Sequence, residues 1–165
     1  MCVTQVNLVP KKAGALQGYN VKKIYPGDHH ALAVTQDGKL IAWGRPTYGR
    51  LARDDAIVDS DTGISPGEVS VEGLEGAPVG AAAGGTVSGC YSNEMCGLWL
   101  CGMGSTGMLA KGADDDDDEK LMTKVKRTKV FNEVSIKHLE FGGQHVVMLI
   151  EPCKPAEAPE ENKNQ

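Results

Sequence analysis

Segments of this chain resemble one another at an offset of 58 residues, and this spacing constrains the fold more than any other feature. Residues 21–52 align with 79–110 without a gap, and 7 of the 32 positions are identical. Composition alone gives about two or three identities. The identical pairs are Val21/Val79, Gly27/Gly85, Leu40/Leu98, Gly44/Gly102, Gly49/Gly107, Leu51/Leu109 and Ala52/Ala110, and Gly143 continues the glycine series. The pattern predicts repeated supersecondary units that stack on one another.

Each repeat is predicted to consist of β-strands. Short apolar runs at 31–35 and 39–43 flank Asp37-Gly38, a pair that suits a tight hairpin turn with positive φ. The second copy keeps this outline with a poorer turn at 95–97, and the third keeps one strand that stops at Pro152. With 21 glycines and no long periodic helix, the chain is predicted to be all-β. The Pro- and Glu-rich segment 152–165 is predicted to be a disordered tail.

The glycines at 102, 104 and 107 fit the pattern G-x-G-x-x-G, which in a dinucleotide-binding unit follows a strand and opens a helix. Here a glycine-broken, strongly acidic segment follows, so no helix is expected. Gly102 and Gly107 also hold the repeat positions of Gly44 and Gly49, whereas Gly104 corresponds to Pro46. The glycines are therefore interpreted as turn residues of a β-repeat rather than as a nucleotide site.

Composition and motifs exclude several classes of function. The net charge of -5 argues against strong nucleic-acid binding, and no apolar run is long enough for a membrane span. No signal-peptide pattern is found, so the protein is expected to be intracellular and its five cysteines reduced. A zinc site at Cys90, Cys96 and Cys101 stays possible, but buried packing is favoured because C-x-x-C spacing is lacking. No catalytic motif, cofactor site or small-molecule substrate is predicted.

Two stretches resemble the repeats of the regulator of chromosome condensation family. They are GDHHALAVTQDGKLIAWGRPTYGRL and FGGQHVVMLI, and the similarity runs from about Val21 to Ile150. The second copy has lost the histidine, at Val87, and the tryptophan, at Cys101. The resemblance implies a β-propeller of seven four-stranded blades. It also implies that one propeller face binds the small GTPase Ran and promotes GDP release, while the other engages chromatin.

At 58 residues a repeat, the 165 residues hold about two and a half blades of such a propeller, so a partial propeller is expected. Residues 1–20 are assigned to the end of a preceding blade, 21–78 and 79–136 to two repeats, and 137–151 to the closing strand of the last repeat. Open sheet edges would favour association. The chain is accordingly expected to be the carboxyl-terminal portion of a longer protein and not to fold well alone.

His29 and His145 follow repeat glycines by two residues, and by resemblance both match histidines on the Ran-facing side. A neutral imidazole at a loop tip can donate and accept hydrogen bonds. The alternative is that each histidine bonds backbone between blades. Asp28 is a weaker candidate, because Gln144 replaces it in the third copy. His30 and Tyr48 are predicted to be packing residues, and Trp43 a core wedge between blades.

The carboxylates at 114–119 are predicted to form a solvated, mobile loop. Calcium binding is the alternative, although the glycine of an EF-hand loop is missing. The bases at 120, 124, 126, 127 and 129 are expected to compensate this charge, with phosphate contact as the minority interpretation.

Two functions stay open on the sequence. The first is part of a Ran-type guanine-nucleotide exchange factor, nuclear and chromatin-associated, with the cytoplasm as the alternative location and weak activity for this chain alone. The second is a propeller-repeat module that binds other proteins without exchange activity, since a fold does not fix a function.

Overall fold

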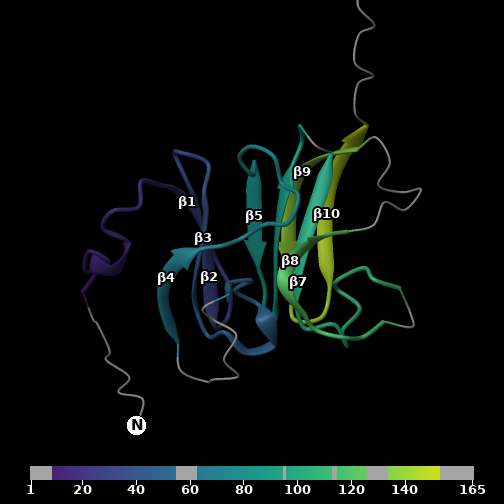
Figure 1. Ribbon diagram of the computed structural model, residues 1–165, viewed down its shortest axis with the longest axis horizontal. Coiled ribbons are helices and arrows are strands. Elements are labelled where there is room, and N and C mark those ends of the chain that lie inside the picture. The colour runs from purple at the N-terminus through teal and green to yellow at the C-terminus, as the bar shows by residue number, and fades with distance from the viewer. Residues whose placement is uncertain (1–8, 55–62, 95, 113–114, 126–133, 153–165) are drawn as a thin grey trace, which may run out of the picture.

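The computed structural model describes residues 9–54, 63–94, 96–112, 115–125 and 134–152. Three antiparallel sheets stand side by side in chain order (Figure 1). The first contains β1 (Val21–Pro26), β2 (His30–Thr35), β3 (Leu40–Gly44) and β4 (Ile64–Glu68), and the second β5 (Gly80–Ala83), β6 (Val87–Ser92), β7 (Gly97–Gly102) and β8 (Glu119–Lys124). The third contains β9 (Val134–Phe141) and β10 (Val146–Pro152), and two 3-10 helices are η1 (Gly14–Leu16) and η2 (Thr47–Gly49). The all-β prediction is confirmed. Of the tail predicted at 152–165, Pro152 is instead the last residue of β10, and 153–165 lie outside the described residues.

The hairpin predicted around Asp37-Gly38 is present between β2 and β3. Gly38 has φ +84°, a backbone conformation that favours glycine. The Lys39 amide donates to Thr35 Oγ1 at 2.8 Å and the Thr35 amide to the Lys39 carbonyl at 2.9 Å. These bonds close the turn and fix the register in which Val34 pairs with Leu40.

The repeat is not gapless, because the second hairpin turn is one residue longer than the first. The Thr35 amide bonds the Lys39 carbonyl, so three positions separate the paired residues of the first hairpin. Four positions separate Ser92 from Gly97, the last pair of β6 and β7. As a consequence, the structural counterpart of His30 is Val87, 57 positions later (87 − 30), while Gly44 and Gly102 keep the offset of 58 (102 − 44). The sequence alignment was therefore wrong by one residue along β2 and β6.

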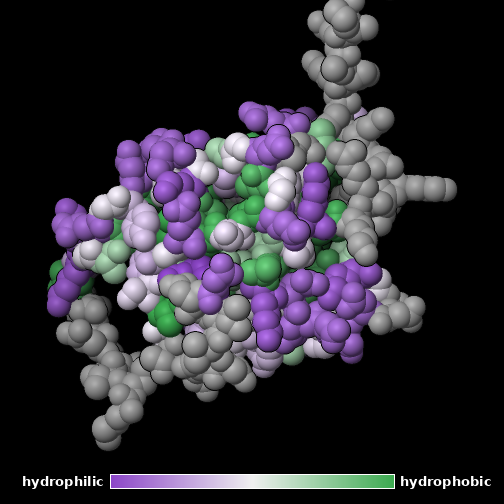
Figure 2. Space-filling view, in the orientation of Figure 1, coloured by the Kyte–Doolittle hydropathy of each residue, from purple (hydrophilic) through white to green (hydrophobic). Residues whose placement is uncertain are grey.

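Apolar side chains fill the two seams between the sheets, and hydrophobic atoms are visible between hydrophilic ones in Figure 2. The seam between the first and second sheets contains Leu32, Val34, Leu40, Ala42, Leu51, Ala52, Val69, Ala81, Ala83, Cys90, Trp99, Cys101 and Met122. The seam between the second and third contains Ala82, Val87, Tyr91, Leu98, Leu100, Met108, Leu109, Ile136 and Leu139. Because alternate strand residues point to opposite faces, the second sheet contributes to both seams.

The tryptophan buried between the first and second sheets is Trp99, and Trp43 lies on the other face of the first sheet. Leu40 and Ala42 point from β3 into the first seam, so Trp43 points to the opposite face and is only half-buried. Trp99 is fully buried and donates from Nε1 to the Glu72 carbonyl at 2.7 Å. The predicted role of Trp43 as a wedge between blades stays a prediction, because Trp43 lies on the face of the first sheet opposite the second sheet.

The last repeat has two strands, β9 and β10, where the sequence indicated one. The two pair from Val134↔Pro152 to Phe141↔Val146, with a register shift at Leu149/Ile150. Val147 and Leu149 are 60% and 62% exposed. They hold the positions of Leu32 and Val34, which are buried against the second sheet. Their exposure shows that, among the described residues, no sheet packs on that face of β10.

The glycine-rich segment behaves as the repeat interpretation predicted. β7 ends at Gly102 and no helix follows it in the described residues. Gly44 and Gly102 have φ +108° and +115°, and Gly49 and Gly107 have φ +74° and +69°. The equivalent glycines thus make equivalent turns in the two sheets.

Candidate functional site

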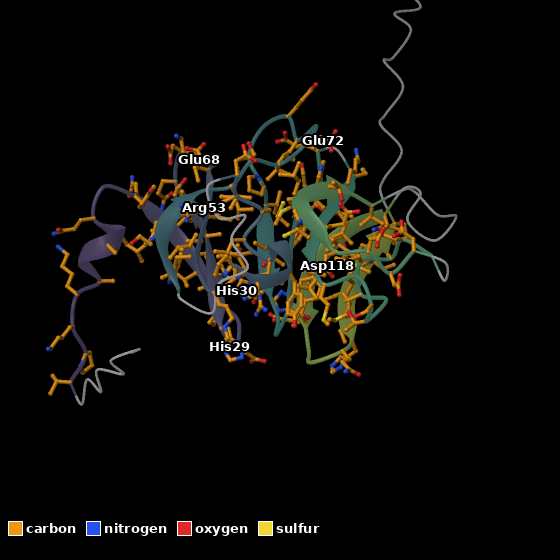
Figure 3. The ribbon with its side chains drawn as sticks, turned by 60° about the horizontal axis from the view of Figure 1, so that its bottom comes forward. His29, His30, Arg53, Glu68, Glu72 and Asp118 are labelled. Atoms are coloured by element: carbon orange, nitrogen blue, oxygen red, sulfur yellow. The ribbon has the colours of Figure 1, made fainter. Side chains whose placement is uncertain are left out.

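The turns that join the first two strands of each sheet lie at one end of the molecule, and we name this end the turn face: residues 27–29, 84–86 and 142–145, with loop residues 45–49 and 103–107. Hydrogen bonds connect neighbouring parts of the face. The Asp28 amide donates to the Gly84 carbonyl at 3.2 Å, and the Arg45 amide to the His29 carbonyl at 2.9 Å. In Figure 3, His29 lies at the lower edge of the view, while Glu68 and Glu72 lie at the upper edge.

The predicted contact residues Asp28, His29 and His145 are all exposed on the turn face. Asp28 and His29 belong to the turn between β1 and β2, and His145 to the turn between β9 and β10. Backbone carbonyls of both turns accept hydrogen bonds, so the backbone is fixed while the side chains reach solvent. The structure thus puts the three residues on one surface, and no direct hydrogen bond joins them among the described residues.

The equivalence of His29 and His145, by contrast, was wrong. The Gly27 amide donates to the His30 carbonyl, the Gly84 amide to the Val87 carbonyl, and the Gly142 amide to the His145 carbonyl, at 2.8, 2.9 and 2.9 Å. His145 is therefore the counterpart of His30. His30 points into the first seam and is buried, whereas His145 is exposed because its face of β10 is uncovered among the described residues.

His30 connects the first two sheets. Its Nε2 lies 2.6 Å from Ser88 Oγ in β6, and its Nδ1 has no hydrogen-bond partner among the described residues. Burial, with the positive charge of Arg50 nearby, lowers the pKa of His30 to about 3. The imidazole is consequently neutral at pH 7. The sequence predicted half-buried packing for His30 and missed this inter-sheet contact.

Arg50 lies beneath the turn face and hydrogen-bonds two of its segments. This residue was not identified from the sequence. Its side chain is fully buried, and its guanidinium donates to the Gly85 carbonyl at 2.6 Å, to Thr47 Oγ1 at 2.6 Å and to the Thr47 carbonyl at 2.8 Å. It also lies 5.3 Å from the centre of the Tyr48 ring. Because Thr47 is in the first sheet's loop and Gly85 in the second sheet's turn, Arg50 holds the two together. Its repeat counterpart is Met108, so the repeat carried no signal for it.

The acidic segment borders the turn face. Asp115 to Asp118 are exposed, and the Gly104 amide donates to Asp118 Oδ1 at 3.0 Å. The hydrophilic surface at the lower right of Figure 2 lies where this segment runs in Figure 1. Lys111 lies 2.6 Å from Asp115 and 2.9 Å from Glu119, and these bonds raise the pKa of its ammonium. Of the predicted compensating bases, Lys120 and Lys124 are exposed on β8, and those at 126, 127 and 129 lie outside the described residues. Within the described residues, Lys111 forms ion pairs with this acidic segment.

The described residues offer no group of acids, histidines or cysteines arranged to hold a metal. Cys90 and Cys101 are buried free thiols, as the packing interpretation predicted, and Cys96 is half-buried. Desolvation raises the pKa of Cys90 to about 12 and that of Cys101 further, so neither is a ready nucleophile. None of the helices within the described ranges is long and apolar enough to cross a membrane. The turn face presents hydrogen-bonding and aromatic side chains, among them His29 and Tyr48, to solvent.

Residues 21–50 match the family model of the regulator of chromosome condensation (RCC1) repeat. These residues run from the start of β1 to Arg50, so the match includes the first turn and its supporting arginine.

Two curated relatives illustrate the range of proteins with such repeats. The chain is 30% identical to the Drosophila melanogaster regulator of chromosome condensation over 141 residues, which cover 82% of the chain and 23% of that protein. It is 29% identical to the ultraviolet-B receptor UVR8 of Arabidopsis thaliana over 146 residues, covering 88% of the chain and 31% of the receptor. The chain thus spans about a quarter to a third of the length of these relatives.

Among solved structures, Prp20p from Saccharomyces cerevisiae matches with a TM-score of 0.69 at 20% identity, covering 86% of this chain and 33% of that chain. That protein is described with its binding properties to Gsp1p and histones. The likeness shows the fold: the three sheets form part of a β-propeller.

Proposed function

Since the chain belongs to the family of RCC1-repeat proteins, we propose that it is part of a guanine-nucleotide exchange factor for a Ran-type small GTPase. In this proposal the GTPase binds the turn face, and binding promotes release of its GDP. The observation that carries the proposal is the turn face itself. Polar side chains from turns of neighbouring sheets reach solvent there, on a backbone fixed by inter-sheet hydrogen bonds.

An exchange factor of this kind needs no covalent chemistry. It binds the nucleotide-free GTPase more tightly than the GDP-loaded form, and by reciprocity that preference weakens GDP. The functional residues of such a factor are therefore groups that contact the GTPase, not catalytic acids and bases. The buried cysteines and the neutral, buried His30 agree with a binding surface of this kind.

Asp28, His29 and His145 are the proposed contact residues. Exposed imidazoles can donate one hydrogen bond and accept another from polar groups of the GTPase. His29 is the stronger of the two histidines, because its turn is bonded to the neighbouring loop through Arg45 and its exposure does not depend on an uncovered face. Asp28 adds a negative charge next to it and is expected to contribute less.

The wider role in this proposal is nuclear, with the opposite propeller face available to chromatin. Prp20p, a structural neighbour, is described with binding to histones as well as to Gsp1p. The net charge of -5 favours contact with histones, which are basic, over direct contact with DNA.

A second function is supported by the range of relatives. UVR8 is a light receptor, and it resembles this chain about as well as the Drosophila regulator does. In the second proposal the repeats form a protein-binding module without exchange activity. The two functions differ in their dependence on nucleotide, because a plain module has no reason to prefer an empty GTPase.

The test is made with the full-length protein, because weak activity is expected for this chain alone. It measures binding to Ran in its GDP-loaded and nucleotide-free forms, together with release of fluorescent GDP. We expect at least about tenfold tighter binding to the empty form. The variant His29→Ala/His145→Ala should weaken that binding about tenfold, since interface contacts that matter cost more than 1 kcal/mol on truncation. His138→Ala is the matched control, because His138 is an exposed histidine of β9 outside the turn face. Equal binding to both forms would favour the module, and an unchanged double variant would refute the histidine assignment.

A further inference from the structure

We propose that Tyr48 is an additional partner-contacting residue of the turn face, an aromatic anchor held in position by the buried guanidinium of Arg50. Tyr48 was predicted from the sequence to be a packing residue, so a contact with a partner is a new role for it. The inference rests on the proposed function, since it names a further residue of the same binding surface.

The backbone at Tyr48 is strained. Its φ of +64° and ψ of +10° fall in the left-handed region, which costs a bulky residue steric energy. The repeat counterpart of Tyr48 is Thr106, and Thr106 does not have a positive φ. Gly49 and Gly107 keep similar conformations in the two loops, so the shared turn does not require the strain. Strain of this kind persists where the surroundings impose it and is frequent at functional sites.

The ring is exposed yet supported. Tyr48 is 42% exposed, although the aromatic side chains of the seams, Trp99 and Tyr91, are buried. Arg50 lies 5.3 Å from the ring centre, and the bonds of Arg50 to Thr47 and Gly85 fix it against both sheets. A ring supported in this way loses little conformational entropy on binding, which favours tyrosine at protein interfaces.

Tyr48 is continuous with the candidate contact residues. Arg45, three residues before it, donates from its amide to the His29 carbonyl at 2.9 Å. On the other side, Arg50 bonds the carbonyl of Gly85, and a Cβ on Gly85 would come within 3.2 Å of Asp28 Oδ2. The ring of Tyr48 therefore lies on the same surface as Asp28 and His29. A protein that contacts those two residues meets the tyrosine as well.

The experiment compares Tyr48→Gly and Tyr48→Phe in binding to nucleotide-free Ran, with urea unfolding measured in parallel. Glycine removes the ring and accepts the positive φ, so the unfolding midpoint should stay unchanged or rise. The affinity should fall about tenfold, a typical effect for an aromatic interface anchor. Tyr48→Phe keeps the ring and should bind within about twofold of the unaltered chain. His138→Ala, outside the turn face, is the control, with no loss of affinity expected.

Affinity lost in Tyr48→Gly at an unchanged or higher midpoint supports the inference. Unaltered affinity of that variant, or a lowered unfolding midpoint, would overturn it, because the ring would then be dispensable or a packing group. Absence of binding by the unaltered chain would overturn the proposed function and this inference together. Normal binding by both the unaltered chain and Tyr48→Gly would overturn this inference alone.

Discussion

The first and second sheets share a topology, but the same repeat position performs different tasks in them. Arg53 and Lys111 are 58 residues apart (111 − 53), and each follows a buried leucine and an alanine with positive φ. Arg53 donates from Nη1 to the carbonyls of Ala42 at 3.0 Å and Ser65 at 2.6 Å. Lys111 bonds the carboxylates of Asp115 and Glu119 and also donates to the Asp117 carbonyl at 3.0 Å.

Both cations fasten the outer strand of their sheet near a register shift. The shift lies between Ala42 and Gly44 in the first sheet and between Leu100 and Gly102 in the second. The guanidinium donates to carbonyls of β3 and β4, while the ammonium bonds a backbone carbonyl and two carboxylates of the acidic segment that leads into β8. The comparison teaches that a repeat preserves the need for a donor at this point, whereas the loop that follows determines which acceptor is used.

The first and second sheets also differ in the burial of their tryptophans, Trp43 and Trp99. Trp99→Ala should reduce the free energy of unfolding by about 3–5 kcal/mol, because it empties a fully buried site in the first seam. It also leaves the Glu72 carbonyl without its donor. Urea unfolding of the chain measures the effect. Trp43→Ala serves as the control and should cost clearly less; equal losses would mean that both rings are buried in solution.

Arg53→Met should lower the free energy of unfolding by about 2–3 kcal/mol. The change keeps the aliphatic part of the side chain but removes the charged donor of two backbone carbonyls. Lys39→Met is the control, since its ion pair with Glu68 at 2.8 Å is exposed. Chemical denaturation compares the two variants, and a loss no larger than that of Lys39→Met would show that Arg53 does not fasten β4.

Acid should weaken the contact between the first two sheets through His30. The pKa of His30 is about 3 in the folded chain and about 6.5 when unfolded, so the unfolded chain binds the proton more readily. Stability from this group is therefore complete above pH 6.5 and is lost as pH falls toward 3, by about 1.4 kcal/mol per pH unit.

The measurement is urea unfolding of the unaltered chain and of His30→Gln between pH 7 and 4.5. In His30→Gln, the free energy of unfolding should fall less steeply with decreasing pH than in the unaltered chain. His29→Gln, which alters an exposed imidazole, should show the same steepness as the unaltered chain. Identical pH slopes for the unaltered chain and His30→Gln would contradict the burial of a neutral His30.

The smallest effect is expected for Lys111→Met. Its ion pairs with Asp115 and Glu119 lie near solvent, so salt should screen them. The thermal midpoint of the variant should be slightly lower at low ionic strength and equal to that of the unaltered chain in about 1 M salt, where the Debye length is about 3 Å. A difference that persists in high salt would indicate that Lys111 contributes by packing.

Much of the local structure could be predicted from the sequence. Asp37-Gly38 specified a hairpin, and the glycines at 44, 49, 102 and 107 specified turns, because positive φ is a local requirement. The register between the repeats was predicted less accurately. The extra residue in the second hairpin turn is invisible to a gapless alignment, and it made His29 rather than His30 the apparent partner of His145.

Part of the candidate site could likewise be predicted from the sequence, and part could not. Exposure of Asp28 and His29 at a turn follows from their place after a repeat glycine. The roles of Arg50 and Tyr48 could not be predicted from the sequence. The equivalent residues of the second repeat are Met108 and Thr106, so neither the buried guanidinium nor the strained φ belongs to a repeated pattern.

The sequence by itself determined the repeat, its strands and turns, and the family they resemble, because these depend on alternation and on glycine at fixed spacing. Only the tertiary structure decided which face of each strand is covered. Stacking one sheet against the next buries Trp99 and His30 and leaves Trp43 and His145 more exposed. Burial is a property of neighbouring sheets and not of the residue or its repeat position, so it emerged only when the sheets were assembled.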